Sequence, residues 1–300
     1  DYSEQALKKS EEVGDRRGIG RTLVILARVY DNLGQTQQAR TYLEQALIIC
    51  KEVKDRTGEA LTLNRLGLFY NRQGDKEQAL KYYEQALSIQ KEIGDLGGQA
   101  KTLNNLGSLY SRLRQNERAL QYLEQALNIS RQVGDFWGEG RILTNLGMVY
   151  YDQHQKEKAL ENLEKALKIS LDAGDQRGEG RVKYNLGRVY ADLGEKRQAL
   201  KDFEEALHID KRVENPRGEG WILHNIGLLY FNWRRFDVAL ASFLLAKGIF
   251  QELGSPNVFE IDHDLGNLHE QVGEEQFTTL LAQVEPEADQ IVEQALREAA

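Results

Sequence analysis

Few side chains of this 300-residue chain have the spacing that catalytic chemistry requires. None of its five histidines lies in a His-x-x-x-His or His-Glu-x-x-His pattern, which would place two metal ligands on one face of a helix. The densest group of titratable residues is Asp262-His263-Asp264, which has the donors of a metal or acid–base site. No second cluster accompanies it, so we favour a solvated helix start and predict no metal site.

Nucleotide-binding motifs are also missing from the sequence. No Gly-x-x-x-x-Gly-Lys-Ser/Thr loop occurs, and the pairs at Gly138-x-Gly140, Gly178-x-Gly180 and Gly218-x-Gly220 lack the third glycine of a dinucleotide fingerprint. These pairs also follow helical patterns, whereas the fingerprint follows a strand. Cys50 lies in an apolar run and is better explained as a core residue than as a nucleophile. We therefore predict that the chain is not an enzyme and binds no cofactor.

The composition describes a helical protein with a real core. Hydrophobic residues make up 41% of the chain and charged residues 29%, and only 3 prolines interrupt it. A single cysteine excludes a disulfide framework and fits a cytoplasmic location. No apolar run approaches the ~18 residues that span a bilayer, and no signal peptide is evident. Because the chain begins at Asp1 without a methionine, we expect it to be part of a longer protein.

The net charge of −8 is concentrated at one end. Residues 271–300 contain seven acidic residues and one basic residue, whereas the other 270 residues contain 40 acids and 38 bases. The chain therefore has no general positive field that would attract nucleic acid.

An internal repeat with a period of 40 residues determines the predicted fold. Tyrosine occupies one position in six copies: Tyr30, Tyr70, Tyr110, Tyr150, Tyr190 and Tyr230. Three residues earlier stands a small residue: Ala27, Gly67, Gly107, Gly147, Gly187 and Gly227. Alanine holds two further positions: Ala39, Ala79, Ala119, Ala159, Ala199 and Ala239, and Ala6, Ala46, Ala86, Ala126, Ala166, Ala206 and Ala246.

Each period contains two amphipathic stretches, such as residues 57–73 and 76–93, whose apolar residues recur at three- and four-residue steps. Each stretch predicts a helix of ~18 residues, ~27 Å long. Gly-Asp pairs such as Gly94-Asp95 separate successive periods, since glycine can end one helix and aspartate can cap the next. One such hairpin cannot bury its apolar face alone, so neighbouring hairpins must stack.

The repeat divides the chain into three parts. Residues 1–14 match only the second helix of a truncated repeat, and residues 15–254 form six 40-residue repeats. Residues 255–300 hold a degenerate repeat followed by an acidic capping helix, since a polar terminal repeat is typical of solenoid proteins.

The pattern Leu106-Gly107-x-x-Tyr110, followed by Ala119, Leu123 and Ala126, resembles the tetratricopeptide repeat (TPR). The period of 40 differs from the usual 34 residues, and the proline that often ends the second helix is missing. This variety is similar to the arrays of kinesin light chain and LGN-type adaptors, and to the TPR regions of bacterial STAND NTPases and CHAT proteins. The resemblance implies an all-α fold, a right-handed α-solenoid of antiparallel helix hairpins.

The same resemblance implies that the first helices of the hairpins line a concave groove that binds a protein or peptide segment. In peptide-binding members of the family, an asparagine at one motif position contacts the ligand backbone. That position corresponds here to Asn105, Asn145, Asn185 and Asn225, whereas Ile25 and Arg65 occupy it in the first two repeats. Alternatively, these asparagines bond the neighbouring helix and only fix the packing of the hairpins.

Charged and aromatic side chains fall at neighbouring groove positions. A basic column, Arg21, Lys101, Arg141 and Arg181, runs beside an acidic column, Glu59, Glu139, Glu179 and Glu219, and Arg28 and Arg188 add further charge. Salt bridges between repeats are the simpler interpretation, and unpaired arginines that bind a ligand carboxylate are the alternative. The C-terminal repeats are aromatic, with Tyr151, Tyr184, Trp221, His224 and Phe231. These aromatic side chains either anchor a ligand or pack against the terminal cap.

Three functional hypotheses follow. The first is a non-catalytic scaffold that binds a protein segment in the groove of repeats three to six, with no nucleic-acid or membrane partner. The second is the ligand-sensing region of a larger bacterial signalling NTPase or CHAT protease, whose catalytic domain would precede this segment. The third, a hydrolase or phosphatase, predicts turnover by the isolated chain and has no residue support.

Overall fold

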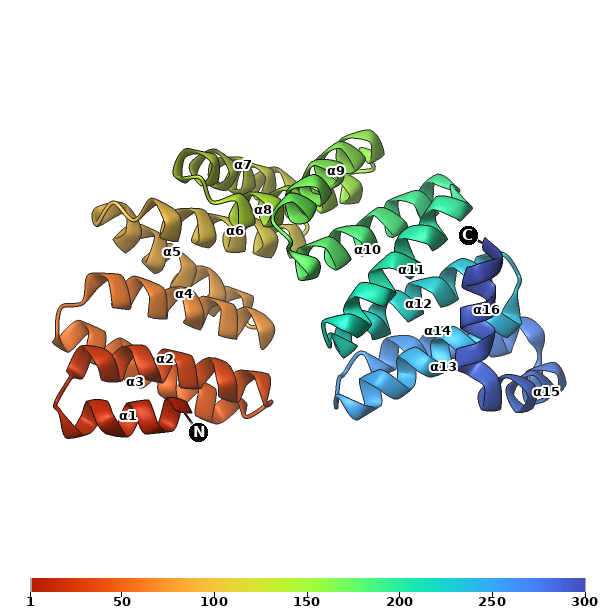
Figure 1. The fold of residues 1–300 in the computed structure, drawn as a ribbon, viewed down its shortest axis with the longest axis horizontal. Coiled ribbons are helices and arrows are strands. Elements are labelled where there is room, and N and C mark those ends of the chain that lie inside the picture. Colours follow the sequence, from red (N-terminus) through yellow and green to blue (C-terminus); the bar gives the residue numbers. More distant parts are fainter. Residues whose placement is uncertain (1, 300) are drawn as a thin grey trace. The chain divides into compact units, whose positions relative to one another are not determined.

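The computed structural model describes residues 2–299 and contains helices but no strand in that range (Figure 1). The α-helices are α1 (Tyr2–Glu12), α2 (Arg16–Asn32), α3 (Thr36–Glu52), α4 (Arg56–Arg72), α5 (Lys76–Glu92), α6 (Leu96–Arg112), α7 (Asn116–Val133), α8 (Phe136–Asp152), α9 (Lys156–Asp172), α10 (Gln176–Leu193), α11 (Lys196–Arg212), α12 (Pro216–Asn232), α13 (Phe236–Glu252), α14 (Val258–Val272), α15 (Glu274–Val284) and α16 (Ala288–Ala299). A short 3₁₀ turn, Glu285–Glu287, joins the last two.

Even-numbered helices from α2 to α12 begin 40 residues apart, and each is followed by an odd-numbered partner. We call these the first and second helices of a hairpin. Most are 17 residues long and a few are 18, as the amphipathic stretches predicted. The predicted all-α fold of stacked helical hairpins is confirmed.

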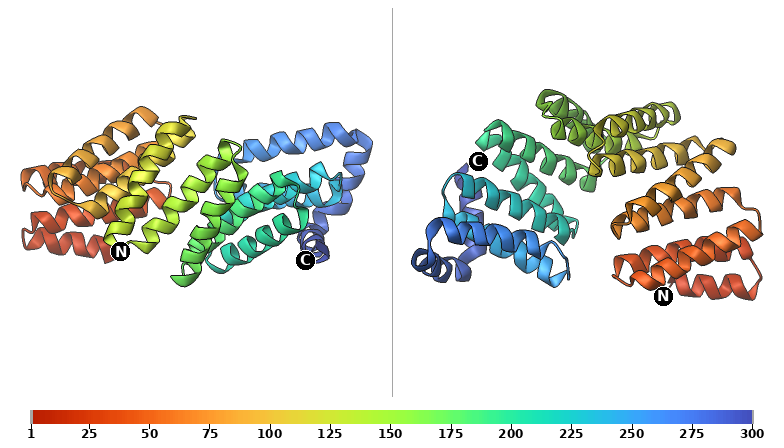
Figure 2. Two further views of the ribbon diagram at one scale, coloured as in Figure 1. Left: turned by 90° about the horizontal axis from the view of Figure 1, so that it is seen from above. Right: turned by 180° about the vertical axis from the view of Figure 1, so that it is seen from behind.

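The chain divides into two compact units, residues 1–149 (unit 1) and 150–300 (unit 2), with the boundary near the end of α8. In unit 1, α1 packs against α2, and the hairpins α2–α3, α4–α5 and α6–α7 stack in chain order. In unit 2, α9 and the hairpins α10–α11 and α12–α13 stack in the same way, followed by α14, α15 and α16. Figure 2 shows both stacks from two further directions.

The repeated aspartates cap the first helices. The Asp95 carboxylate accepts a hydrogen bond from the N–H of Gly98 at 2.8 Å, and Asp135 accepts one from Gly138 at 2.9 Å. A Cβ atom at Gly138 would lie 2.4 Å from Asp135 Oδ2, so glycine lets the capping carboxylate lie close to the helix there. A Cβ atom at Gly180, the second glycine of another pair, would lie 2.9 Å from Ile209 on α11. Helix capping and close packing thus explain the Gly-x-Gly pairs.

The core of each hairpin is built around the column of small residues on the first helix. A Cβ atom at Gly107 would lie 2.5 Å from Leu123 Cγ, and one at Gly227 would lie 2.5 Å from Phe243 Cε1. Both second-helix side chains are fully buried. Glycine therefore lets a large side chain of the second helix sit directly on the backbone of the first.

The C-terminal helices complete the core of unit 2. Ile261 and Leu268 of α14 and Val292 and Leu296 of α16 join one hydrophobic cluster with α11, α12 and α13. The helix α16 packs against α13 and α11. The hydroxyl of Tyr230 on α12 also donates to the carbonyl of Ala295 on α16 at 3.0 Å. The last helices therefore cover apolar surface that the sixth repeat would otherwise expose.

Candidate functional site

The asparagine column lies on successive first helices and forms hydrogen bonds between them. Asn105 Nδ2 on α6 donates to Asn64 Oδ1 on α4 at 3.1 Å, and Asn145 Nδ2 on α8 donates to Asn104 Oδ1 on α6 at 2.8 Å. The partners Asn64 and Asn104 belong to a second polar column, which the sequence analysis missed. Its signal was present, because each partner stands 41 residues before its donor.

The same pairing continues in unit 2 with a different partner. Asn225 Nδ2 donates to the Tyr184 hydroxyl at 3.1 Å and to the Trp221 carbonyl at 2.8 Å. Asn185 holds the equivalent position on α10 and is buried, with 6% of its surface exposed. Asn105, Asn145 and Asn225 therefore have a packing role. An amide carries two N–H donors and one carbonyl acceptor, so one such bond leaves capacity for a further partner.

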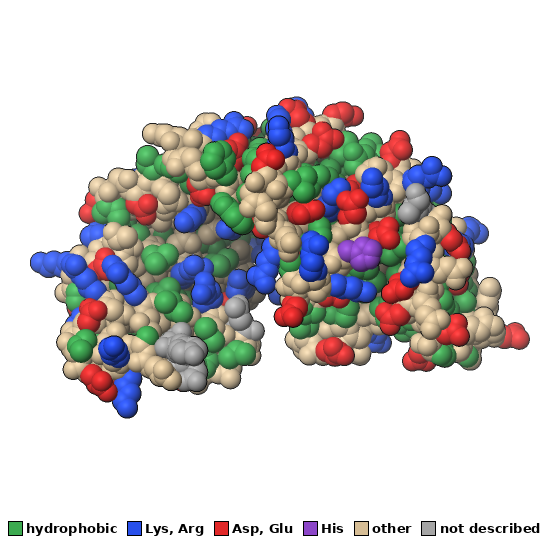
Figure 3. Space-filling view, viewed as in Figure 1, with side chains coloured by type: hydrophobic (Ala, Val, Ile, Leu, Met, Phe, Trp, Pro, Cys, Tyr) green, Lys and Arg blue, Asp and Glu red, His purple; other side chains and the backbone are tan. Residues whose placement is uncertain are grey.

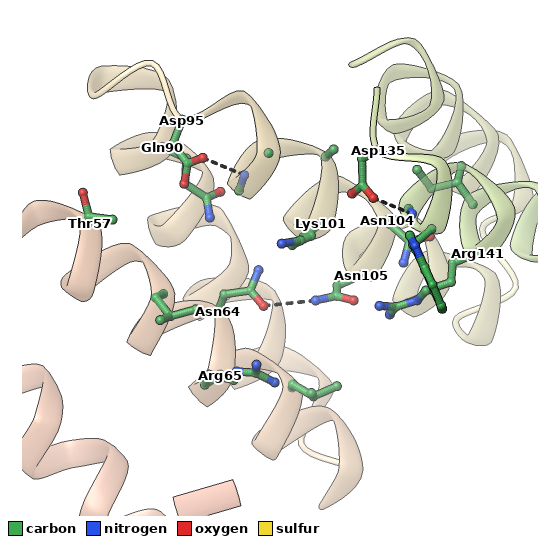
Figure 4. A pocket seen from close by; sticks show the side chains of 18 of the residues that line it. Thr57, Asn64, Arg65, Gln90, Asp95, Lys101, Asn104, Asn105, Asp135 and Arg141 are labelled. Carbon is green, nitrogen blue, oxygen red and sulfur yellow. Dashed lines mark hydrogen bonds between the residues drawn. The ribbon is translucent and has the colours of Figure 1, made fainter. Parts of the chain in front are cut away.

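In unit 1 the first helices α4, α6 and α8 line a groove of about 810 Å³ (Figure 4). Arg65 of α4, Lys101 of α6 and Arg141 of α8 line it together with Asn64 and Asn105. The space-filling view shows lysine and arginine side chains gathered over the α4 region of unit 1 (Figure 3). The groove thus combines amides with cationic side chains.

The acidic column does not neutralise these cations in the part of the chain that the structure describes. Glu59 pairs with Arg56 at 2.6 Å, and Glu139 pairs with Arg131 at 2.7 Å. Loss of hydration lowers the pKa of Arg65, and repulsion from Arg28, Arg72 and Arg141 lowers it further. The simpler interpretation, salt bridges between the two columns, therefore does not describe these pairs in unit 1.

In unit 2 the predicted groove residues contact one another. The Arg188 guanidinium lies 5.3 Å from the ring centre of Tyr151 and 5.8 Å from that of Tyr184, so it stacks between two aromatic rings. Burial, assisted by the nearby Asp192 carboxyl, raises the pKa of Tyr151 to about 12. Burial also raises the pKa of Tyr184.

Trp221 and His224 face the C-terminal helices of unit 2. The Trp221 ring meets the ring of Phe250 on α13 edge to face, with centroids 5.3 Å apart. His224 is only 3% exposed, and its Nε2 lies 2.7 Å from Asp264 Oδ2 on α14. Packing against the cap thus accounts for His224, which does not line an open surface, while Trp221 remains partly exposed.

No catalytic cluster accompanies these residues. Within residues 2–299, no group of three His, Cys, Asp or Glu side chains is arranged to hold a metal ion. Asp264 of the Asp-His-Asp segment is engaged with His224, and Cys50 is buried with its pKa raised by that burial. Among the described helices, none is both long and apolar enough to cross a membrane.

Tetratricopeptide repeat models match residues 58–132 and 138–212, and another model of the same repeat matches residues 21–53. The chain belongs to the tetratricopeptide repeat family. TPR proteins are generally non-catalytic scaffolds, and this array has the fold of a protein-interaction repeat domain.

Solved structures share this fold at low sequence identity. BtubC from P. vanneervenii is 23% identical with a TM-score of 0.61, over 71% of this chain and 90% of that one. A Rap protein in complex with competence and sporulation factor is 15% identical with a TM-score of 0.70, over 95% and 77%. A STAND ATPase with a TPR sensor from Pyrococcus horikoshii is 18% identical with a TM-score of 0.64, over 94% of this chain but 46% of that one. No curated protein matches the chain.

Proposed function

We propose that this TPR array is a scaffold that binds a segment of another protein along its first helices. The observation that carries this proposal is the repeated placement of amide side chains at one position of α6, α8, α10 and α12. Extended peptides present unpaired backbone N–H and C=O groups, which amide side chains can satisfy. Within unit 2, Asn185 and Asn225 would contact a peptide backbone, with Trp221 or Tyr184 providing specificity, and within unit 1 Asn145 would make the same kind of contact.

The test must separate ligand contact from helix packing, because Asn145 and Asn225 also bond neighbouring helices. The chain offers a matched control for that purpose. Asn104→Ala removes the acceptor of the Asn145 hydrogen bond but leaves all the proposed ligand-contacting residues in place. The test variant is Asn145→Ala, Asn185→Ala and Asn225→Ala combined. Circular dichroism melting should establish that each variant is folded at the assay temperature.

Both variants would serve as bait in an affinity pull-down from a source-cell lysate. A partner retained by wild type and by the control, but lost by the triple variant, supports peptide contact by the asparagines. Equal loss from both variants would mean that the hydrogen bonds matter only for packing. Retention by both would direct the search to other faces of the array.

A second candidate is the ligand-sensing region of a larger signalling NTPase. The likeness to a STAND ATPase whose TPR region is described as a sensor motivates it, although that likeness is one of fold. A phosphate-binding motif encoded upstream of Asp1 in the parent gene would support this candidate. An upstream sequence without one would count against it.

A further inference from the structure

The helix α13 departs from the other second helices at two neighbouring positions of the repeat. The first position holds glutamate in the earlier copies: Glu44, Glu84, Glu124, Glu164 and Glu204. The second is polar in the same copies: Gln45, Gln85, Gln125, Lys165 and Glu205. In α13 both positions are leucine, Leu244 and Leu245. The helix α16 packs against α13, yet both leucines remain partly exposed. Contact with α16 therefore does not fully account for the change to leucine.

The exposed parts of these leucines line a cleft of about 340 Å³ in unit 2, to which α11, α12, α13 and α16 contribute. Ile249 of α13 is also partly exposed there, and the buried side chains Leu207 of α11 and Val292 of α16 complete the apolar lining. Small-molecule sites have volumes of roughly 300–1,000 Å³. The cleft therefore has the size and the apolar lining of a site for a small ligand.

A glycine keeps this cleft open. Gly248 lines it and is the only glycine within the second helices α3, α5, α7, α9, α11 and α13. A Cβ atom at Gly248 would meet no heavy atom within 4 Å, so close packing does not require glycine there. Glycine inside a helix lowers the stability of that helix. The earlier copies carry a side chain at this position: Ile48, Ser88, Asn128, Lys168 and His208.

The charged residues that line the cleft are mostly acidic. Lys211 is the only base among the described lining residues, and the acids are Glu219, Glu252, Asp289 and Glu293. Glu293 pairs with Arg297 at 3.2 Å. No ion pair engages the other three carboxylates within residues 2–299. The lining therefore carries more negative than positive charge, which favours a cationic ligand.

Glu219 is the carboxylate best placed to receive such a cation. Glu139 of α8 pairs with Arg131 at 2.7 Å, and Glu219 and Lys211 occupy the same two positions of a later repeat. Glu219 and Lys211 form no ion pair in the part of the chain that the structure describes. Burial raises the pKa of Glu219, Lys211 lowers it, and Asp210 raises it. A partly buried carboxylate without a bonded cation gains stability from one that enters the cleft.

We propose that this cleft binds a small organic cation, with a protonated amine on Glu219 and an apolar body against Leu244 and Leu245. An apolar pocket with a few charged groups is the usual form of a small-molecule site, and a hydrogen bond between two charged groups is stronger than one between neutral groups. The inference goes beyond the proposed function. The cleft lies mainly between second helices and α16, whereas the proposed segment binds along the first helices.

The probe is octylamine, with octanol and octanoate as its uncharged and anionic counterparts. Isothermal titration calorimetry of the full chain at neutral pH should show octylamine binding about tenfold more tightly than octanol, the value of one charge-assisted contact. Octanoate should not bind, because the acidic lining repels it.

Two variants test the charge and the space separately. Glu219→Gln should weaken octylamine binding about tenfold and leave octanol binding unchanged, since the amide keeps the shape but loses the charge. Its control, Glu179→Gln, removes the same charge at the equivalent position of α10 and should change affinity by no more than about twofold. Gly248→Leu fills the cleft and should weaken octylamine and octanol alike, by about tenfold or more. Its control, His208→Leu, adds the same side chain at the equivalent exposed position of α11 and should leave both affinities unchanged.

Gly248→Leu should melt no lower than wild type, because leucine favours a helix more than glycine does and its Cβ atom meets no neighbour. If it does melt lower, Glu219→Gln still decides, since that substitution leaves the apolar lining intact. Absence of octylamine binding to wild type would overturn the inference, as would equal affinity for octylamine and octanol. Undiminished binding to a folded Gly248→Leu would overturn the location. A peptide of lysine and leucine that binds the cleft while octylamine does not would assign it to a basic segment of a partner instead.

Discussion

Units 1 and 2 are built from the same 40-residue hairpin but treat their groove positions differently. Unit 1 has 21 basic and 19 acidic residues, a net charge of +2, whereas unit 2 has 18 basic and 28 acidic residues, a net charge of −10. In unit 1, Arg65 and Arg141 at groove positions lack acidic partners among the described residues, whereas Arg72 pairs with Asp31. In unit 2, Arg188 stacks between two tyrosines, and His224 pairs with Asp264.

One column of the repeat illustrates the divergence. In the second, fifth and sixth full copies it holds Asn64, Tyr184 and His224, each of which bonds a residue on the next first helix. The amide leaves polar groups at the groove, while the aromatic rings fill the same position with apolar surface. The backbone of a solenoid can therefore stay the same while the side chain at one repeat position changes. A polar side chain there can bind a ligand, whereas an aromatic side chain packs against its neighbours.

The largest expected change in stability comes from a substitution in the C-terminal helix α16. It tests whether this helix stabilises unit 2 without affecting unit 1. Val292→Asp places a carboxylate in the cluster that α16 forms with α11 and α13, where Val292 is 3% exposed. We expect unit 2 to lose about 3 kcal/mol or more of its unfolding free energy, because burying an unpaired charge is costly. Amide hydrogen exchange should accelerate in α11 to α13 and remain unchanged in α2 to α5.

The control for this variant is Gln290→Asp, which adds the same charge at an exposed position of α16. It should leave exchange in unit 2 nearly unchanged. Faster exchange throughout unit 1 in Val292→Asp would contradict the separation of the two units.

A second test compares the glycine column in the two units. Gly227→Ala drives a Cβ atom into the buried ring of Phe243, and we expect a loss of about 2 kcal/mol from overpacking. Gly107→Ala meets Leu123 instead, and the array already accepts this combination in its first repeat, where Ala27 packs in one cluster with Leu43. There the gain in helix propensity, about 1 kcal/mol, should offset most of the strain.

Urea unfolding of both glycine variants measures the difference directly. Equal destabilisation by the two substitutions would show that the identity of the facing side chain does not matter.

A third test concerns a buried carboxylate of unit 2 at a repeat position where unit 1 has Cys50, Gln90 and Ser130. Asp210 is 6% exposed, and burial raises its pKa, although Asn215 and Arg177 act in the opposite direction. The equivalent Ser130 donates its hydroxyl to the carbonyl of Asp135 at 2.8 Å. We therefore expect Asp210→Ser to stabilise the chain by about 1 kcal/mol at neutral pH.

The pH dependence of that gain follows from the direction of the shift. A raised pKa means that folding favours the protonated carboxyl, so wild type recovers stability as the pH falls through the pKa of folded Asp210. The advantage of Asp210→Ser should shrink in acid. Thermal melts at neutral and acidic pH check this, and an advantage that grows in acid would refute the assignment.

The fold could be predicted because its causes are local and repeated. Columns of glycine, alanine and tyrosine mark helix contacts in successive periods, and Asp-x-x-Gly marks most caps of the first helices, as Asp95 and Gly98 show. The resemblance to the TPR family followed from the same columns and is confirmed. The split into two units had no such signal, since the period of 40 continues across it.

The candidate site was less accessible to sequence reasoning, because it depends on which neighbours a side chain reaches. The sequence identified Asn105 and Asn145 but not their partners Asn64 and Asn104, which belong to the preceding repeat. It also treated Arg65 as a break in the asparagine column. The arginine's place in a groove beside Arg141 depends on the stacking of hairpins. Peptide contact by these residues stays a prediction.

The smallest expected change in unfolding free energy has opposite signs in the two units. It tests whether arginines at groove positions differ in role between unit 1 and unit 2. Arg65→Met removes a half-buried cation without an acidic partner, and we expect the unbound chain to gain roughly 0.5–1 kcal/mol. Arg188→Met removes a cation that stacks on Tyr151 and Tyr184, and we expect a loss of about 0.5–1 kcal/mol. Both substitutions remove one positive charge from a first helix and supply a similar apolar stem, so thermal melts compare them directly. Because a half-buried cation without a counter-ion lowers the stability of the folded protein, a loss of stability in Arg65→Met would mean that Arg65, like Arg188, serves packing.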